Sequence, residues 1–261
     1  MRKALAITVA LGAFEAFLHP QLPAQEQANT GHTPAESARL LLAPSNTAVI
    51  PVPKDKPAWL ERHAAMNAKA KAGGIDLIYI GDSIVQFFET TGLNVWNRYY
   101  APRKALNLGI SGDRTQHVLW RLDNGNLDGI SPKLAIVMID QNNGGHNSAE
   151  EIAEGVKAVV ERIRTKLPQT QILLLGIFQR REKPTPEREV LAKANEVISM
   201  LADGKTIHFM DINPLFVQAD GSIPVELMPD FEHPSAKGYQ VWGEAIEPEV
   251  ARLMGEKQSG I

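Results

Sequence analysis

Short apolar runs alternate with longer amphipathic stretches along most of this chain, and this alternation constrains the fold more than any other feature. The apolar runs are residues 76–80, 105–108, 134–139, 171–177 and 206–210, and the stretches with helical spacing are residues 59–71, 114–123, 149–166, 186–203 and 235–254. Runs that are apolar on both faces are typical of strands that helices cover on both sides. The pattern therefore predicts an α/β fold, a three-layer αβα sandwich around a five-stranded parallel sheet with flavodoxin-like strand order.

The first 55 residues fall outside this alternation. Residues 1–24 hold Arg2, Lys3, an apolar stretch and small residues near Ala24, which is the layout of a cleaved signal peptide, with an amphipathic helix as the alternative. A signal peptide implies a periplasmic or secreted protein. Residues 25–55 are predicted to form a proline-containing linker or strap, because their prolines interrupt any helix, and residues 56–258 are predicted to form the folded domain.

Composition and charge exclude several classes of function. The 261 residues include no cysteine, which rules out disulfides, thiol catalysis and cysteine-ligated metals. The net charge of −3 and the lack of a Lys/Arg-rich run argue against nucleic acid as a partner. The apolar N-terminal stretch is too short for a stable membrane span, and no other segment reaches that length.

Residues suited to acyl transfer follow the predicted strands, where ligands bind in sheets of this kind. Ser83 stands at a strand-to-helix turn, which favours negative charge on its oxygen, although a helix cap explains it equally well. Gly112 lets a backbone N–H approach a ligand, or it serves a turn. Asn142 offers an amide donor to an oxyanion, or it forms an Asx turn. Further along the chain, the spacing of Asp230 and His233 allows the carboxylate to orient the imidazole.

These residues occur in the order of the motif blocks of the SGNH/GDSL hydrolases, and the chain resembles that family. The resemblance is closest to the platelet-activating-factor acetylhydrolase catalytic-subunit (beta/gamma-like) branch. The matching segments are GDSIVQ at 81–86, NLGISGD at 107–113, HVLWRLDNGNL at 117–127 and R-x-E-K-P at 180–184. The resemblance extends from about residue 53 to residue 254, which is nearly the whole predicted domain.

The resemblance implies a serine esterase that needs neither metal nor cofactor and acts on a small-molecule ester. Ser83 would be the nucleophile and His233 the general base, oriented by Asp230. The backbone N–H groups of Ser83 and Gly112 and the side chain of Asn142 would form the oxyanion hole. The expected substrate is an acyl ester, in the first place an acetyl ester, of a carbohydrate or another small polar molecule. A homodimer is left open as the assembly.

Polar or charged residues stand at several positions where the family has small or apolar ones. Asp140 and Gln141 replace a glycine and a residue that is often threonine, and Glu232 replaces an apolar residue before the histidine. Arg181 lies in a segment that usually reads Pro-Arg-Gly. We expect these four residues, together with Ile84, to contact the substrate, and we expect Gln141 and Glu232 to make the wall of the acyl pocket polar.

The negative charge expected on Asp140 has a further consequence. An unpaired carboxylate beside the oxyanion hole would oppose the developing oxyanion and raise the pKa of His233. Arg181 is therefore predicted to lie within salt-bridge reach of Asp140 or Glu232, with Asp140 close to Ser83.

Two other functions stay open at this point. The carboxylates of Asp82, Asp113, Asp140 and Asp230 suit a hard cation, which would support metal-assisted hydrolysis. Alternatively, the domain is a non-catalytic binding module in which Asp140 has disabled the oxyanion hole, because a fold does not guarantee an activity.

Overall fold

A five-stranded sheet forms the centre of the structure, a computed structural model that describes residues 46–256. Its strands are β1 (Leu77–Gly81), β2 (Ala105–Gly109), β3 (Leu134–Met138), β4 (Gln171–Leu175) and β5 (Ile207–Met210). The strand order is β2-β1-β3-β4-β5, and every neighbouring pair is parallel. The predicted flavodoxin-like sheet is confirmed. The predicted signal peptide and the first part of the predicted linker, up to residue 45, lie outside the described residues.

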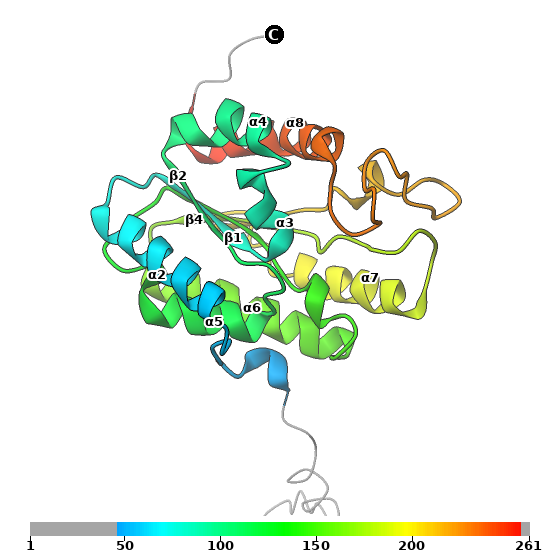
Figure 1. The fold of residues 1–261 in the computed structure, drawn as a ribbon, viewed down its shortest axis with the longest axis horizontal. Coiled ribbons are helices and arrows are strands. Elements are labelled where there is room, and N and C mark those ends of the chain that lie inside the picture. Colours follow the sequence, from blue (N-terminus) through cyan, green and yellow to red (C-terminus); the bar gives the residue numbers. More distant parts are fainter. Residues whose placement is uncertain (1–45, 257–261) are drawn as a thin grey trace, which may run out of the picture. The chain divides into compact units, whose positions relative to one another are not determined.

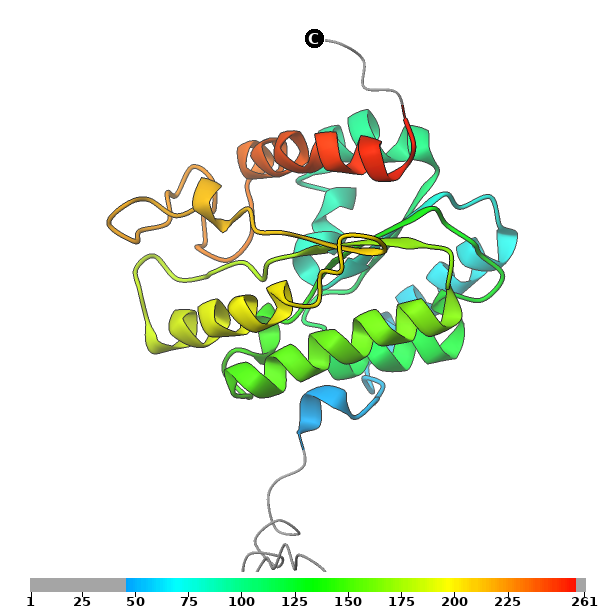
Figure 2. The same cartoon turned by 180° about the vertical axis from the view of Figure 1, so that it is seen from behind.

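Helices cover both faces of this sheet (Figures 1 and 2). One face is covered by α2 (Pro57–Ala72), α5 (Thr115–Arg121), α6 (Ala149–Lys166) and α7 (Pro186–Ser199), and the other by α3 (Ser83–Gln86), α4 (Leu93–Val95) and α8 (Ala236–Leu253). Short helical turns join these elements: η1 (Thr47–Val49), η2 (Phe87–Glu89), η3 (Trp96–Tyr100), η4 (Ala101–Arg103), η5 (Leu122–Asn126), η6 (Gln141–Asn143) and η7 (Asn213–Leu215). Within residues 46–256, none of the helices combines the length and the apolar character that a membrane crossing requires.

The hydrophobic core has two halves because strand side chains alternate between the faces of the sheet. In β1, Ile78 and Ile80 pack under α2, α5 and α6, whereas Leu77 and Tyr79 pack under α8. All four side chains are fully buried. Complete burial of an aliphatic side chain contributes about 1.5–3 kcal/mol, so β1 is a main source of stability.

Local signals place most helix ends close to their predicted positions. Ser148 and Glu151 form a capping box at the start of α6, which begins and ends where the pattern predicts. Helix α2 begins two residues early, at Pro57, because proline is favoured in the first turn of a helix. Helix α7 ends at Ser199 rather than residue 203, where the Asp203 carboxylate accepts hydrogen bonds from the three N–H groups that lead into β5.

The end of β2 lies directly against the turn that carries Ser83. A Cβ on Gly109 would lie 2.4 Å from the Gln86 nitrogen and 2.8 Å from the Asp82 oxygen, both backbone atoms. Backbone atoms of two elements cannot move apart without breaking strand pairing, so only glycine fits here. Gly109 therefore sets the distance between the second strand and α3.

Replacing Gly109 by alanine is expected to destabilise the protein by about 1–3 kcal/mol or more, because the added methyl group overpacks a rigid contact. Urea unfolding followed by circular dichroism measures the change. Gly145→Ala is the matched control, since the nearest atom to a Cβ there is a side-chain oxygen at 3.7 Å. Equal stability of the two variants would show that β2 and α3 separate easily.

Candidate active site

Ser83, His233 and Asp230 form one hydrogen-bonded series, although Ser83 and His233 lie 150 positions apart in the chain. The Ser83 Oγ is 2.9 Å from the His233 Nε2, and the His233 Nδ1 is 2.7 Å from the Asp230 Oδ2. These distances are consistent with a ring whose Nδ1–H donates to the carboxylate while Nε2 accepts the serine hydroxyl. The structure thus brings together the three residues that the sequence nominated as nucleophile, base and orienting acid.

The position of Ser83 follows from the residues on either side of it. Strand β1 ends at Gly81, and Asp82 caps α3 by accepting a hydrogen bond of 3.0 Å from the Ile84 N–H. Ser83 is the first residue of α3, where a backbone N–H has no partner within the helix. Its side chain is almost completely buried at the carboxyl end of the sheet.

Local hydrogen bonds hold the loop that carries His233. The Asp230 Oδ1 accepts the backbone N–H groups of Glu232, at 3.0 Å, and His233, at 2.7 Å. Phe231 adopts a left-handed backbone with φ 57°, and the Phe87 ring packs 5.1 Å from the His233 ring. Partial burial raises the pKa of Asp230, but the hydrogen bonds from the His233 backbone and ring outweigh it, so its pKa lies below the usual value. Asp230 is therefore a carboxylate at neutral pH.

The three nominated oxyanion donors lie on neighbouring segments, since Asn142 contacts Asp82, next to Ser83, and Asp113, next to Gly112. Gly112 has φ 71° and is exposed, and its N–H donates no hydrogen bond to any residue in the described part of the chain. The Asn142 Nδ2 donates to the Asp82 Oδ2 at 3.1 Å and to the Asp113 backbone oxygen at 2.9 Å. Both amide hydrogens of Asn142 thus have acceptors in the free protein. The backbone N–H groups of Ser83 and Gly112, in contrast, donate to no acceptor within residues 46–256.

The surroundings of Asp140 oppose the negative charge that the sequence led us to expect there. Asp140 is completely buried, and neither carboxyl oxygen has a hydrogen-bond partner among residues 46–256. Burial, and next the neighbouring Asp82 carboxyl, raise the pKa of Asp140 well above its usual value, which favours the protonated, neutral form. Its backbone has φ 108°, a conformation that suits the glycine found in the family.

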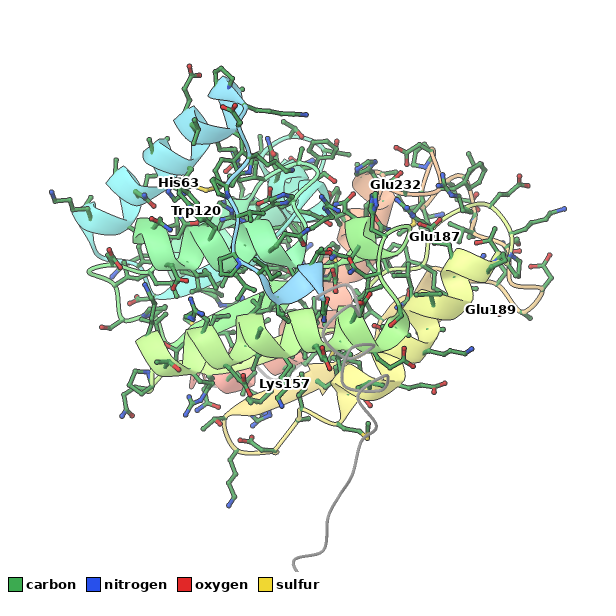
Figure 3. The ribbon with its side chains drawn as sticks, turned by 90° about the horizontal axis from the view of Figure 1, so that it is seen from below. His63, Trp120, Lys157, Glu187, Glu189 and Glu232 are labelled. Carbon is green, nitrogen blue, oxygen red and sulfur yellow. The ribbon has the colours of Figure 1, made fainter. Side chains whose placement is uncertain are left out.

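The predicted partners of Arg181 are also wrong. Its side chain is exposed and lies 3.5 Å from Glu187, not from Asp140 or Glu232. Arg180 instead pairs with Glu232, at 3.2 Å, and with Glu187. Figure 3 labels these two glutamates, Glu187 on α7 and Glu232 on the loop that carries His233. Arg180 is the less exposed of the two arginines and lies against both carboxylates, whereas Arg181, with a left-handed φ of 74°, leaves its side chain 55 % exposed.

Burial also removes two other predicted substrate contacts. Ile84 is fully buried in the core beneath α8, and its backbone oxygen accepts a hydrogen bond of 2.7 Å from the Tyr239 hydroxyl. Gln141 is 1 % exposed, and its Nε2 donates to the Phe178 oxygen at 3.4 Å. Neither side chain has surface to offer a substrate, so Gln141 does not make the wall of an acyl pocket polar.

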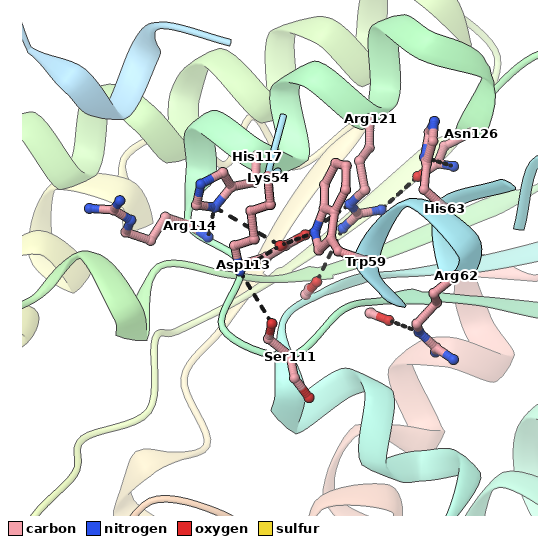
Figure 4. A network of polar contacts seen from close by, with 12 residues as sticks. Lys54, Trp59, Arg62, His63, Ser111, Asp113, Arg114, His117, Arg121 and Asn126 are labelled. Atoms are coloured by element: carbon pink, nitrogen blue, oxygen red, sulfur yellow. Dashed lines mark hydrogen bonds and ion pairs between the residues drawn. The ribbon is translucent and has the colours of Figure 1, made fainter. Parts of the chain in front are cut away.

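A buried polar network that the sequence did not reveal lies beside the Gly112 loop (Figure 4). Its centre is Asp113, whose carboxylate accepts from Arg121 at 2.8 Å and from Trp59 at 2.7 Å and lies 3.2 Å from the Lys54 Nζ. Asp113 and Arg121 both stand in matching motif segments, which was an available signal, whereas nothing in the sequence marks Lys54. In residues 46–256 no three His, Cys, Asp or Glu side chains are grouped so that they hold a metal ion.

Residues 79–241 match the model of the GDSL-like lipase/acylhydrolase family. The chain belongs to this family. It is 38 % identical over 201 residues to platelet-activating factor acetylhydrolase IB subunit alpha1 of Homo sapiens, covering 77 % of this chain and 86 % of that protein. Subunit alpha2 of Rattus norvegicus is 37 % identical over 199 residues, covering 76 % and 86 %. The resemblance inferred from the motif blocks is confirmed.

Solved structures of the family share the fold of this GDSL-like acylhydrolase. A GDSL-like lipase from Bacteroides thetaiotaomicron superposes with a TM-score of 0.58 at 17 % identity, covering 74 % of this chain and 97 % of that one. An acetylxylan esterase from Geobacillus stearothermophilus has a TM-score of 0.54 at 19 % identity, covering 71 % and 96 %. The fold and the family together make the protein a serine ester hydrolase of the SGNH/GDSL type.

Replacing Asp140 by glycine is expected to stabilise this hydrolase, and more so at higher pH. Burial raises the pKa of Asp140 in the folded protein well above its usual value, whereas the unfolded carboxyl ionises near pH 4. The folded state then binds more protons than the unfolded one, so the Asp140 contribution to stability falls as pH rises above about 4. We expect a gain of about 1–3 kcal/mol at pH 7.5 and a smaller gain at pH 4, measured by urea unfolding.

Lys104→Gly is the control for the backbone part of this effect. Lys104 is exposed and has a left-handed φ of 50°, so its replacement by glycine relaxes the same kind of backbone without removing a buried carboxyl group. Its only ion pair in the described residues is an exposed one with Asp76, at 3.5 Å, which contributes little to stability, so its replacement should change stability by a similar small amount at both pH values. A gain in Asp140→Gly that does not vary with pH would mean that Asp140 is ionised in the folded protein.

Proposed function

We propose that the protein is a serine esterase that removes acetyl groups from a carbohydrate or another small polar alcohol. The observation that carries the proposal is the hydrogen-bonded series from the Ser83 Oγ through the His233 ring to the Asp230 carboxylate. Relatives named as acetylhydrolases support acetyl as the acyl group. The roles of the three residues then follow from their geometry.

In the first half of the reaction, the Ser83 Oγ attacks the ester carbonyl carbon and its proton passes to the His233 Nε2. The Asp230 carboxylate, 2.7 Å from the Nδ1, stabilises the imidazolium that forms. The carbonyl oxygen becomes an oxyanion beside the free N–H groups of Ser83 and Gly112. His233 then gives its proton to the leaving alcohol, and the acetyl group stays on Ser83. In the second half, His233 activates water to release acetate.

Asn142 supplies the third donor by exchanging one of its present acceptors for the oxyanion. Its bond to the Asp113 backbone oxygen is made to a neutral carbonyl. A hydrogen bond to a charged oxygen is roughly twice as strong as a bond to a neutral one. The exchange therefore becomes favourable only when negative charge develops, which is the condition for lowering the transition-state barrier rather than tightening substrate binding.

Two neighbouring cavities support a polar leaving group. A cavity of about 330 Å³ lies beside His233, and a second of about 320 Å³ shares Thr91 with it. The second cavity is lined by the amide, guanidinium and ammonium side chains Asn94, Arg98, Lys237 and Gln240. Such groups hydrogen-bond to hydroxyl-rich alcohols, so an acetylated sugar fits this side of the site better than a purely apolar alcohol.

Ser83→Ala and His233→Ala are each expected to lower kcat on 4-nitrophenyl acetate by about 10⁴–10⁶-fold, because nucleophile and base act as a unit. Asp230→Asn should lower kcat by about 10⁴-fold or less, since it disturbs only the orientation of the imidazole and its charge. A fluorophosphonate probe should label the wild-type protein at Ser83, as located by peptide mass spectrometry.

Acetyl and butyryl 4-nitrophenyl esters and acetylated xylo-oligosaccharides form the substrate panel for the same preparation. Faster release of acetyl than of butyryl groups, and release of acetate from the sugars, is the expected result. An unlabelled Ser83 together with full activity of Ser83→Ala would show that the mechanism is wrong. Labelling of Ser83 without turnover of any ester on the panel would refute the proposed substrate class.

Asn142→Ala is expected to lower kcat by about 10²–10³-fold with little change in KM, the usual effect of losing one oxyanion donor. Steady-state kinetics on 4-nitrophenyl acetate separates the two constants. A rise in KM at constant kcat would assign Asn142 to substrate binding instead.

A further inference from the structure

Residues 46–56, called the strap below, are tied to the domain beside the Gly112 loop. The Val52 N–H donates to the Gln116 backbone oxygen at 3.1 Å, and the Thr115 hydroxyl donates to the Ala48 oxygen at 2.8 Å. Asn46 reaches the first turns of α6, where its Nδ2 donates to the Glu151 oxygen at 3.1 Å. These contacts give the strap a defined path that ends at Pro57, the first residue of α2.

The strap carries one ammonium group to the loop that contains Gly112. The Lys54 Nζ donates to the Ser111 backbone oxygen at 3.3 Å and lies 3.2 Å from the Asp113 Oδ1 (Figure 4). It also lies 3.3 Å from the point that a Cβ on Gly112 would occupy. Since the N–Cα bond is about 1.5 Å long, the Lys54 charge lies within roughly 6 Å of the Gly112 nitrogen. The Lys54 side chain is only 16 % exposed, so water screens this charge poorly.

Lys54 is a surplus charge in this cluster. Asp113 already has a full partner in Arg121, since both side chains are completely buried and the Arg121 Nε lies 2.8 Å from the Asp113 Oδ2. His117 adds no charge, because burial lowers its pKa to about 4. Burial also lowers the pKa of Lys54, but the carboxylate of Asp113 opposes that shift. The ion pair is therefore complete without Lys54, and Lys54 leaves the cluster with a net positive charge next to Gly112.

We propose that Lys54 is a positioning residue of the oxyanion hole, which holds the Gly112 loop through the Ser111 oxygen and places positive charge beside the developing oxyanion. The proposal rests on the function proposed above, in which the Gly112 N–H stabilises the oxyanion. The oxyanion is the only species in that reaction whose charge forms at this loop. A fixed cation here lowers the energy of the transition state more than that of the neutral ester, so its effect falls on kcat.

Lys54→Met removes the charge and keeps most of the length of the side chain. Because Lys54 acts beside the donors and is not one of them, we expect kcat on 4-nitrophenyl acetate to fall about tenfold, less than for loss of a donor, with KM within twofold. Lys54→Arg should retain most of the activity. Lys56→Met is the matched control, since it removes the same charge from an exposed position two residues along the strap and should leave kcat unchanged.

Because the chain contains no cysteine, a single thiol can be introduced and modified at this position. In Lys54→Cys the thiolate displaces bromide from 2-bromoethylamine, which rebuilds a side chain of lysine length with an ammonium end. Iodoacetamide, by displacement of iodide, gives a neutral side chain of similar size. Intact mass confirms each product, and thermal unfolding confirms that each is folded. We expect the ammonium product to regain the lost kcat and the neutral product not to regain it.

The outcomes separate this proposal from the function on which it rests. Wild-type kcat in Lys54→Met, or equal recovery by the neutral and the ammonium products, would overturn the role of the charge while Ser83→Ala remains inactive. A rise in KM alone would reassign Lys54 to substrate binding and overturn the proposal as well. Full activity in Ser83→Ala would overturn the proposed function, and the role of Lys54 with it.

Discussion

The buried ion pair between Asp113 and Arg121 is the interaction on which the rest of the site depends. Removing two charges from water is unfavourable unless further hydrogen bonds satisfy them. Here Trp59 donates to the carboxylate at 2.7 Å, and the guanidinium donates to Asn126 at 2.6 Å and to the Gly81 oxygen at 3.4 Å. One ion pair thereby joins α2, α5, the end of β1 and the loop after β2. The turn before the nucleophile and the loop with the candidate oxyanion donor are held in register by the same two side chains.

The loop that carries His233 is held by short-range hydrogen bonds rather than by a buried ion pair. Asp230 and His233 lie on a partly exposed loop whose shape comes from short-range hydrogen bonds, those of the Asp230 carboxylate with the two N–H groups that follow. Arg180 also contacts this loop through its ion pair with Glu232. A candidate oxyanion side whose loop is anchored by a buried ion pair therefore faces a candidate base on a partly exposed loop. This division suits acyl transfer, in which charge must be held on one side and protons must move on the other.

The failed expectations all concern surroundings that the chain brings together from a distance. The glycine-to-aspartate change at Asp140 was recognised, but the effect of its surroundings was not, because complete burial disfavours the charged carboxylate. Arg181 was assigned Glu232 as a possible partner, which its neighbour Arg180 takes instead. Ile84 was placed on the substrate, yet α8 packs over it. In each case the unusual residue was identified from the sequence, but its neighbours in space come from distant parts of the chain and could not be predicted from the sequence.

The sequence alone predicted the αβα architecture and the strand order, and it nominated Ser83, His233 and Asp230, which the fold brings within hydrogen-bond distance of one another. The spacing of apolar side chains predicts helices and strands because each such side chain favours the interior. The order of the motifs can be read directly from the sequence. Only the tertiary structure decided the surroundings of each charged group. Burial raises the pKa of Asp140, and the Lys54 ammonium lies beside the Gly112 loop, to which it donates across 57 positions of the chain. The physical reason is that protonation and ion pairing depend on local dielectric and on neighbouring charges, and distant segments supply both.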